Sequence, residues 1–298
     1  MTSVTQARKI LDFNKPVGWV AIIWAKNVVR AYRDHHYPGG DNGRIRQNRH
    51  DGNERGRTHM VFYNLRWVPL YRYFKELMDG GYVGRPFDCH LHRRIGHLKW
   101  DYHWLHDRDR SLGAMPTSMI DFALWYFGDI KKVSTSLATF NPIPSPNGQS
   151  YEPANDSAVL AVQYSNGAHG TICRSMVVHL GNHQQSITVN GEKGRLESFL
   201  NTEAVLDWRG EIRGAQTHEN EVKKLEIPER FWEGVDQTKS GLDLLVESLT
   251  KQSVGDRLFV DAILNGTPVS PNFFDCLKVQ RVVDAAFRAH ESGKWVTL

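Results

Sequence analysis

Five histidines lie close together between residues 90 and 106, and imidazole is both a proton carrier near neutral pH and a common metal ligand. His90 and His92 are two residues apart, so they share one face if this segment is a strand. His97, His103 and His106 follow without a spacing typical of a metal site. We interpret the group as pocket-lining or surface histidines, with metal binding as the alternative, and assign His103 to substrate binding.

The glycines bear on a second kind of chemistry, the binding of a dinucleotide. A Rossmann site needs the spacing G-x-G-x-x-G, because the diphosphate must approach the backbone closely at a helix N-terminus. No two of the 25 glycines are separated by a single residue, so G-x-G is absent from these 298 residues. The nearest pattern, the glycines within residues 80–84, follows an expected helix and is typical of a helix end. We therefore expect no complete dinucleotide site within this chain.

The charge pattern and the length of the apolar runs bear on two further classes of partner, nucleic acids and membranes. The net charge is +4, and the basic excess is concentrated between Lys26 and Met60. That Gly- and Asn-rich stretch has no recognition-helix or RNP pattern, so we interpret it as a solvated loop rather than a nucleic-acid site. The longest apolar run near the N-terminus, residues 17–25, is too short to span a bilayer. We expect neither a nucleic-acid partner nor a membrane partner.

The cysteine pattern points to a reducing compartment. The three cysteines, Cys89, Cys173 and Cys276, are far apart and form no C-x-x-C. Neither a disulfide framework nor a structural zinc site is expected from this spacing, and a cytoplasmic location fits best. Hydrophobic residues make up 40% of the chain, which is enough to bury a sizeable core.

Regular elements begin at about residue 58. Alternating side chains predict a strand over 58–65. Pro69 suits the first turn of a helix that ends at Gly80-Gly81, and apolar residues three and four apart give this helix one buried face. A strand over 86–93 and a helix over 118–127 follow.

From residue 134 onward the pattern is mostly strand. Strand patterns over 157–164 and 168–176 flank Asn166-Gly167, a strong hairpin signal because a type I′ turn needs positive φ at both central residues. A second hairpin joins 186–189 to 195–199. Helices are predicted over 242–249, 257–264 and 274–290, and a short strand over 295–298. We predict an α+β fold with a large, mostly antiparallel sheet and helices packed on one face.

In order and spacing, these segments resemble the glucose–fructose oxidoreductase/inositol dehydrogenase (Gfo/Idh/MocA) family, mainly its C-terminal domain. The similarity covers roughly residues 58 to 298. The segment 58–67 resembles the last Rossmann strand of that family and the Asn/Arg-containing turn after it. Further similar segments are 73–86, 119–130, 155–156, 166–172, 189–196, 283–286 and 292–296.

The resemblance implies NAD(P)-linked redox chemistry on a sugar, polyol or similar small molecule. Members of the family pair a Rossmann domain with a sheet-rich domain that forms the substrate pocket and the oligomer interface. On this basis residues 1–66 are an irregular, incomplete remnant of the dinucleotide-binding domain, with its last strand at about 58–65. Residues 67–298 are the substrate and oligomerisation domain. We expect a homo-oligomer formed through the sheet face, because alternation in 158–164 and 170–176 gives each strand an apolar face.

The family's Glu-Lys-Pro motif, which places a lysine near the nicotinamide, is echoed here by Asn14-Lys15-Pro16. The resemblance makes Lys15 a catalytic candidate, able to polarise a hydroxyl or carbonyl and relay its proton. Together, Lys15 and Pro16 are the cofactor-binding candidates. The change from Glu to Asn removes a carboxylate partner, and a surface Lys-Pro turn is the alternative interpretation.

The family's second hallmark, Asp-x-Gly-x-His-x-x-Asp, is matched here at its last position alone. Alignment on Asp121 puts Ser118 where the histidine belongs and Ala114 where the first aspartate belongs. Asp121 is therefore the second catalytic candidate, and its alternative role is a capping-box pair with Ser118. Arg66 follows the strand over 58–65 and is a substrate-binding candidate, with an ion pair bracing the interdomain seam as the alternative.

Two functional hypotheses remain open. The first is a Gfo/Idh/MocA-like oxidoreductase that uses NAD or NADP, here truncated and weakly active or inactive. The second is a non-catalytic ligand-binding or oligomerisation module that binds no cofactor itself. Residues 17–57 are either an insertion or a segment translated out of frame.

Overall fold

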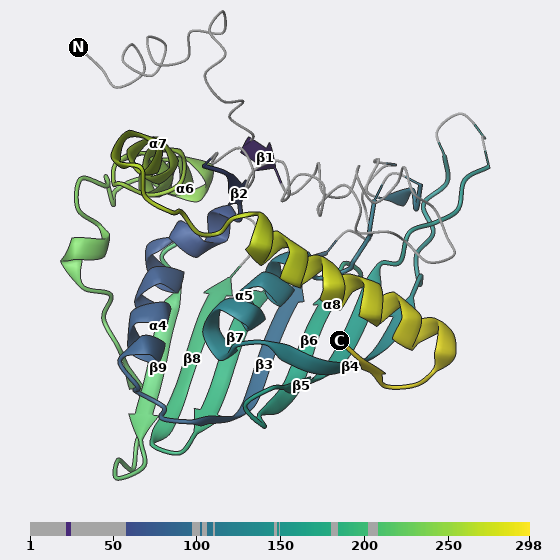
Figure 1. Cartoon of the computed structure of the whole chain (residues 1–298), viewed down its shortest axis with the longest axis horizontal. Helices are drawn as coiled ribbons and strands as arrows, with labels where there is room; N and C mark the ends of the chain where they lie inside the picture. The colour runs from purple at the N-terminus through teal and green to yellow at the C-terminus, as the bar shows by residue number, and fades with distance from the viewer. Residues whose placement is uncertain are drawn as a thin grey trace, which may run out of the picture.

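The computed structural model of this chain describes residues 22–24, 58–96, 102, 106–109, 111–145, 148, 150–179, 184–201 and 208–298, with the backbone alone for 22–24. A nine-stranded sheet dominates, in the order β10-β9-β8-β7-β3-β6-β5-β4-β11 (Figure 1). Its strands are β3 (Pro86–Arg94), β4 (Ile130–Ala138), β5 (Ser157–Tyr164), β6 (His169–Ser175), β7 (Gln184–Gly191), β8 (Gly194–Asn201), β9 (Glu211–Gln216), β10 (Lys223–Lys224) and β11 (Val296–Thr297).

Every neighbouring pair in this sheet is antiparallel except β3 and β6, so the predicted mostly antiparallel sheet is confirmed. The predicted hairpin at Asn166-Gly167 joins β5 to β6, and Gly167 has φ +92°. Gly170 lies where β6 runs beside β3. A Cβ at this position would stand 1.6 Å from the backbone oxygen of Cys89, so the close approach of the two strands requires glycine.

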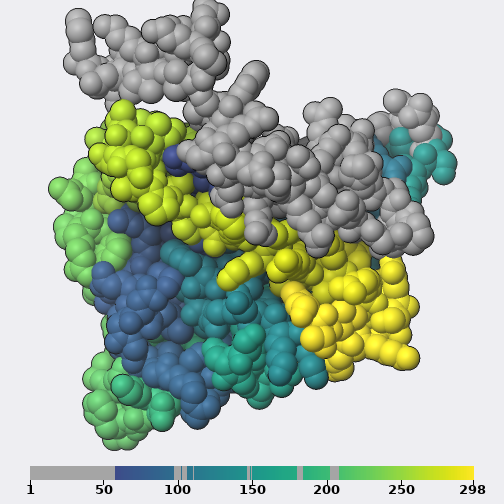
Figure 2. All heavy atoms as spheres, viewed as in Figure 1, coloured from purple at the N-terminus to yellow at the C-terminus, as the bar shows by residue number. Residues whose placement is uncertain are grey.

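Three helices cover one face of the sheet: α4 (Pro69–Asp79), α5 (Thr117–Phe127) and α8 (Phe273–Ser292) (Figures 1 and 2). Helix α4 begins at Pro69, as predicted, and buries Leu70 and Phe74. Helix α8 has a capping box in which Asn272 and Asp275 satisfy N–H groups at its start. The predicted helix-covered sheet is confirmed.

The apolar side of the strands is buried within the chain itself. On β5 the side chains of Ala158, Leu160, Val162 and Tyr164 face the helices, and all four are at most 1% exposed. We expected this alternation to mark a face buried against another subunit, and that interpretation is wrong: the chain's own helices cover it. Val159 lies on the opposite side of β5 and is 47% exposed, so the face without helices is the one open to a partner among the described residues.

A smaller core lies beside the large one. The strands β1 (Ile22–Trp24) and β2 (Met60–Phe62) form a parallel pair, and β2 leads into the 3₁₀ helix η1 (Asn64–Trp67). Met60 and Trp67 pack with Phe259 of α7 (Asp256–Asn265). The strand predicted over 58–65 is therefore shorter than expected, because its second half coils into η1. Most of the predicted remnant over 1–66 lies outside the described residues.

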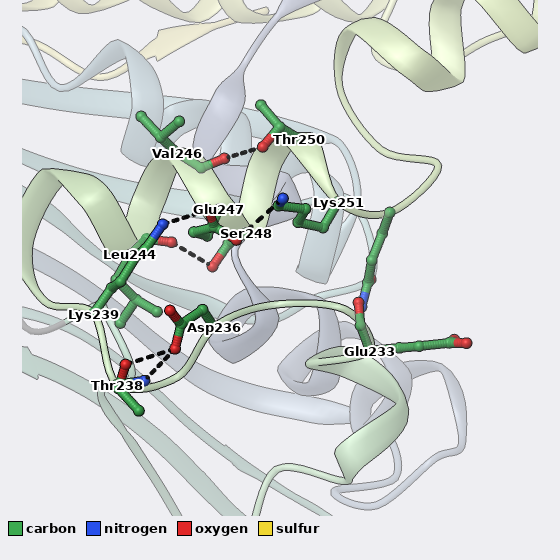
Figure 3. Close-up of polar contacts among 11 residues, drawn as sticks. Glu233, Asp236, Thr238, Lys239, Leu244, Val246, Glu247, Ser248, Thr250 and Lys251 are labelled. Atoms are coloured by element: carbon green, nitrogen blue, oxygen red, sulfur yellow. Dashed lines mark hydrogen bonds and ion pairs between the residues drawn. The ribbon is translucent and has the colours of Figure 1, made fainter. Parts of the chain in front are cut away.

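Polar contacts fix the segment around α6 (Gly241–Thr250), as Figure 3 shows. The carboxylate of Glu247 accepts from Lys239 at 2.7 Å and lies 3.7 Å from the Lys251 ammonium group, so one side chain ties the residues before and after the helix. Within the helix, the Ser248 hydroxyl donates to the Leu244 carbonyl at 2.9 Å.

None of the helices in the described part of the chain has the length and apolar character to span a bilayer.

Candidate functional site

Two of the predicted site residues, 55 positions apart, meet in the core. Arg66 lies in η1 and Asp121 lies in the second turn of α5. The guanidinium donates through Nε to Asp121 Oδ2 at 2.8 Å and through Nη2 to Oδ1 at 2.6 Å. This two-bond geometry fixes orientation as well as distance. The pair therefore locks the segment after β2 onto the helix that crosses the sheet.

Aromatic and polar groups surround this pair. The Arg66 guanidinium lies 5.0 Å from the centre of the Trp125 ring and donates to the Ser270 hydroxyl at 3.4 Å. Ser270 in turn donates to Asp275 at 3.0 Å, at the start of α8. The cluster thus connects η1, α5 and α8, the three elements that meet at this end of the sheet.

Burial sets the electrostatics of the pair. Loss of water raises the pKa of the Asp121 carboxyl to about 6, and the Asp275 charge adds to this rise while Arg66 opposes it. The pKa of Arg66 is raised, because the attraction of Asp121 and its hydrogen bonds outweigh the effect of burial. At neutral pH both groups are charged. Asp121 is 1% exposed and Arg66 is 5% exposed, so the carboxylate faces the guanidinium rather than an open surface.

The alternatives raised for these two residues are resolved by this geometry. The capping-box interpretation of Asp121 with Ser118 is wrong: α5 has Pro116 at its N-cap position and no side-chain cap. Both carboxylate oxygens of Asp121 are directed at Arg66 instead. Arg66 does form an ion pair, with Asp121 of α5 as its partner, and the bracing of an interdomain seam stays a prediction. The catalytic role of Asp121 and the substrate-binding role of Arg66 stay predictions.

The first turn of α5 carries the residue aligned with the family histidine. Thr117 and Ser118 are partly exposed, whereas residues 111–116 before them and residues 119–123 after them are buried. Ala114, at the position of the first family aspartate, is fully buried and offers no polar group. Ser118 is therefore partly accessible to solvent, but its hydroxyl does not titrate near neutral pH.

The histidines near residue 90 lie on the other side of the sheet. His90 and His92 share one face of β3, as predicted, and this is the face without helices. The Thr171 hydroxyl lies 2.8 Å from His90 Nδ1 and 3.2 Å from His92 Nε2, and Asp88 lies 2.8 Å from His90 Nε2. No group of three or more His, Cys, Asp or Glu side chains in the described residues could hold a metal ion.

The remaining predicted site residues, Lys15, Pro16 and His103, lie outside the described residues.

Sequence reasoning also missed a feature of the inner sheet face. Arg93 and Arg174 are direct neighbours on β3 and β6, on the helix side, in line with the buried Leu91 and Ile172. The signal was present, since each arginine occupies an inward position of an alternating strand pattern.

The described residues do not fit a dinucleotide. A diphosphate cradle needs closely spaced glycines at the N-terminus of a helix that follows a parallel strand. Of the described elements, β1 and β2 alone form a parallel pair outside the main sheet, and the element that follows β2 is the four-residue η1. The described residues therefore do not form a dinucleotide site by themselves.

Comparison with known proteins places this fold. Residues 75–298 match the Gfo/Idh/MocA family model described as "Oxidoreductase family, C-terminal alpha/beta domain". Among curated proteins, no sequence matches this chain. The chain belongs to the Gfo/Idh/MocA oxidoreductase family and contains its C-terminal domain.

Solved structures share the fold at low sequence identity. A levoglucosan dehydrogenase in complex with NADH and L-sorbose is 21% identical, with a TM-score of 0.67 over 81% of this chain and 66% of that one. An oxidoreductase domain protein from Kribbella flavida is 22% identical, with a TM-score of 0.70 over 83% and 67% of the two chains. An oxidoreductase from Agrobacterium radiobacter, in complex with NAD⁺, L-tartaric acid and magnesium, is 17% identical, with a TM-score of 0.65 over 91% and 76%. This chain thus spans about two thirds of the length of the first two.

Proposed function

We propose that this chain is the substrate side of an NAD(P)-linked oxidoreductase that acts on a sugar, polyol or similar small molecule. The observation that carries this proposal is the family match over 75–298, together with the nine-stranded sheet and its covering helices. Similar folds in complexes with NADH and L-sorbose, or with NAD⁺ and L-tartaric acid, support the choice of cofactor and substrate class. The substrate pocket lies near the first turn of α5, where Ser118 reaches the surface.

We infer that the polypeptide alone is weakly active or inactive. It has no G-x-G, and Ser118 and Ala114 replace the histidine and the first aspartate of the family motif. A serine cannot take up the proton of a substrate hydroxyl as an imidazole does. Within the described residues, Asp121 could do so chemically, but it is engaged by Arg66. Lys15 and Pro16 remain the proposed contacts to the nicotinamide side, and His103 and Arg66 the proposed contacts to the substrate.

The decisive experiment is a fluorescence titration of the 298-residue chain with NADH and with NADPH up to millimolar concentrations. Saturable binding, even if weak and accompanied by slow turnover of a sugar or polyol, would support the oxidoreductase proposal. Absence of saturation would remove the oxidoreductase proposal for this polypeptide and favour the alternative, a non-catalytic module for ligand binding or oligomerisation. A Ser118→His variant is the companion: faster turnover is expected if this position faces the reacting hydroxyl.

We further propose that the chain forms homo-oligomers through the sheet face that carries no helices. The supporting observation is that this face is extended and carries two exposed apolar side chains, Val159 on β5 and Phe199 on β8. Stacked sheets commonly bury such faces against each other.

A reducing cytoplasmic location is consistent with three free cysteines, Cys89, Cys173 and Cys276.

A further inference from the structure

Two neighbouring arginines on the inner face of the sheet have no anionic partner among the described residues. Arg93 of β3 and Arg174 of β6 are paired across the parallel strands, with both side chains on the helix-covered side. The Nε atoms of both are buried and make no hydrogen bond. The Arg174 side chain makes a single hydrogen bond, a long one of 3.4 Å to the Gly113 carbonyl. By contrast, Arg66 in the same core is fully paired with Asp121.

The electrostatics agree with this geometry. Burial lowers the pKa of Arg174 to about 9, and the charge of Arg93 adds to the effect. Burial also lowers the pKa of Arg93, and Tyr71 is the group that opposes this shift. No described carboxylate contributes to either shift, so two positive charges lie side by side in a poorly hydrated place. Such an arrangement is costly unless an anion completes it.

A third unpaired donor belongs to Asn155, whose backbone contacts the same loop as Arg174. Asn155 is 5% exposed, and its side-chain Nδ2 makes no hydrogen bond. Its backbone oxygen accepts from Ala114 at 2.7 Å, so it lies directly against the loop whose Gly113 carbonyl accepts from Arg174. Arg174 and Asn155 thus both contact the loop 113–114, just before the first turn of α5, and Arg93 lies beside Arg174 on the neighbouring strand. Carboxylate and phosphate oxygens are the groups that satisfy clustered guanidinium and amide donors.

We propose that Arg93 and Arg174, with Asn155, form an anion-binding subsite that takes the carboxylate or phosphate group of the substrate. That the anion belongs to the substrate rests on the proposed function, since the subsite lies beside the α5 turn where we place the pocket. The substrate class is therefore a sugar acid or a sugar phosphate rather than a neutral sugar. A free inorganic anion is the other source of the same chemistry.

The test compares ligands on the intact chain by thermal unfolding at constant ionic strength. Glucuronate, glucose 6-phosphate, inorganic phosphate and neutral glucose are the probes. At about ten times its Kd, a sugar anion should raise Tm by about 3 °C, whereas glucose should not. The preferred sugar anion, acid or phosphate, identifies the group. An equal response to inorganic phosphate alone would overturn the substrate assignment, and no response to any anion would overturn the subsite.

Variants locate the effect. Arg93→Met and Arg174→Met keep the aliphatic stem but remove the charge, so each should abolish the anion response and raise Tm of the free protein. Arg213→Gln, at an exposed position within β9, is the control that should leave the response unchanged. An unchanged response in both Met variants would overturn the proposal. If either Met variant fails to fold, Arg93→Lys and Arg174→Lys replace them. The Kd of each Lys variant for the sugar anion should then be at least about tenfold higher than that of the wild type.

A parallel NADH titration separates the two proposals. An anion response without NADH binding leaves the subsite standing and removes the oxidoreductase proposal for this polypeptide. NADH binding without an anion response leaves the oxidoreductase proposal standing and removes the subsite.

Discussion

The guanidinium of Arg66 and the carboxylate of Asp121 meet through two hydrogen bonds of 2.8 and 2.6 Å, in a place where both side chains are almost fully buried. This contact joins η1, next to the smaller core, to α5, which crosses the main sheet. A residue identified for its chemistry therefore also holds two parts of the fold together. Any loss of activity at Asp121 has to be separated from a loss of structure.

Asp121→Ala should destabilise the protein by about 3 kcal/mol at pH 7, because it leaves the Arg66 charge buried without a partner. Asp79→Ala is the matched control: it breaks the exposed pair between Lys75 and Asp79, whose carboxylate side chain is 63% exposed, and should cost at most about 1 kcal/mol. Urea unfolding monitored by circular dichroism measures both. The double variant Arg66→Met/Asp121→Leu should lose less stability than Asp121→Ala. Equal losses in all three variants would contradict a buried, coupled pair.

His59 should make the stability depend on pH. Its ring stacks on Phe273 at 4.5 Å, and its Nδ1 accepts from the Phe273 N–H at 3.3 Å. Burial lowers the pKa of His59 below its usual 6.5, so the unfolded chain binds a proton more readily than the folded one. This contribution to stability is present above pH 6.5 and is lost as the pH falls through the folded pKa.

The measurement for His59 is the free energy of unfolding between pH 7.5 and 5 for the wild type and for His59→Asn, which keeps an acceptor but does not titrate. The difference between the two proteins should shrink as the pH falls. His218→Asn changes an exposed histidine and should run parallel to the wild type. A constant difference for His59→Asn would show that the pKa of His59 is the same in the folded and unfolded states.

Gly170→Ala should prevent normal pairing of β3 with β6. The added Cβ would stand 1.6 Å from the Cys89 carbonyl oxygen, which is backbone and cannot turn aside. We expect a loss of more than about 3 kcal/mol, or insoluble protein. Gly80→Ala is the milder control: Gly80 follows α4 with φ −71°, which alanine adopts freely, and its Cβ would stand 3.1 Å from the Glu76 carbonyl oxygen, a contact that a small shift relieves. A soluble Gly170→Ala protein with wild-type Tm would show that β3 and β6 are not adjacent.

Val159→Glu should dissociate the proposed oligomer. Val159 is 47% exposed on the face without helices, and a charge there would be buried in a sheet-to-sheet interface. Leu264→Glu changes a residue of α7 that is 60% exposed and should leave the mass unchanged. Light scattering coupled to size-exclusion chromatography gives the mass of each protein. A monomeric wild type, or a Val159→Glu variant of unchanged mass, would count against this interface.

The sequence predicted those elements that begin or end at residues typical of helix ends and turns. Pro69 and Gly80 bound α4 because one suits a first helical turn and the other ends a helix. Asn166-Gly167 predicted the β5–β6 hairpin because few other residues adopt its turn geometry. The helix 118–127 and the C-terminal helices were likewise found to within one or two residues.

Contacts between segments far apart in the sequence could not be predicted from local patterns. Alternation showed that each strand has an apolar side, but not whether that side meets the chain's own helices or another subunit. The partner of Asp121 was misidentified because Ser118 is near in sequence, whereas Arg66 is near in space. The parallel placement of β3 beside β6 was missed for the same reason. The adjacent Arg93 and Arg174 became visible once that placement was known.

The position of β3 also has a consequence for assembly. This strand ends at Arg94, yet it lies between two hairpins, β5–β6 and β7–β8, that are synthesised later. Until both hairpins arrive, β3 has no neighbour on either side, and without β3 each hairpin has an unpaired edge. Folding must therefore wait for contacts between distant parts of the chain, which slows it. A fragment that begins after Arg94 would consist of two separate four-stranded sheets, β10-β9-β8-β7 and β6-β5-β4-β11, with exposed edges at β7 and β6, and should aggregate.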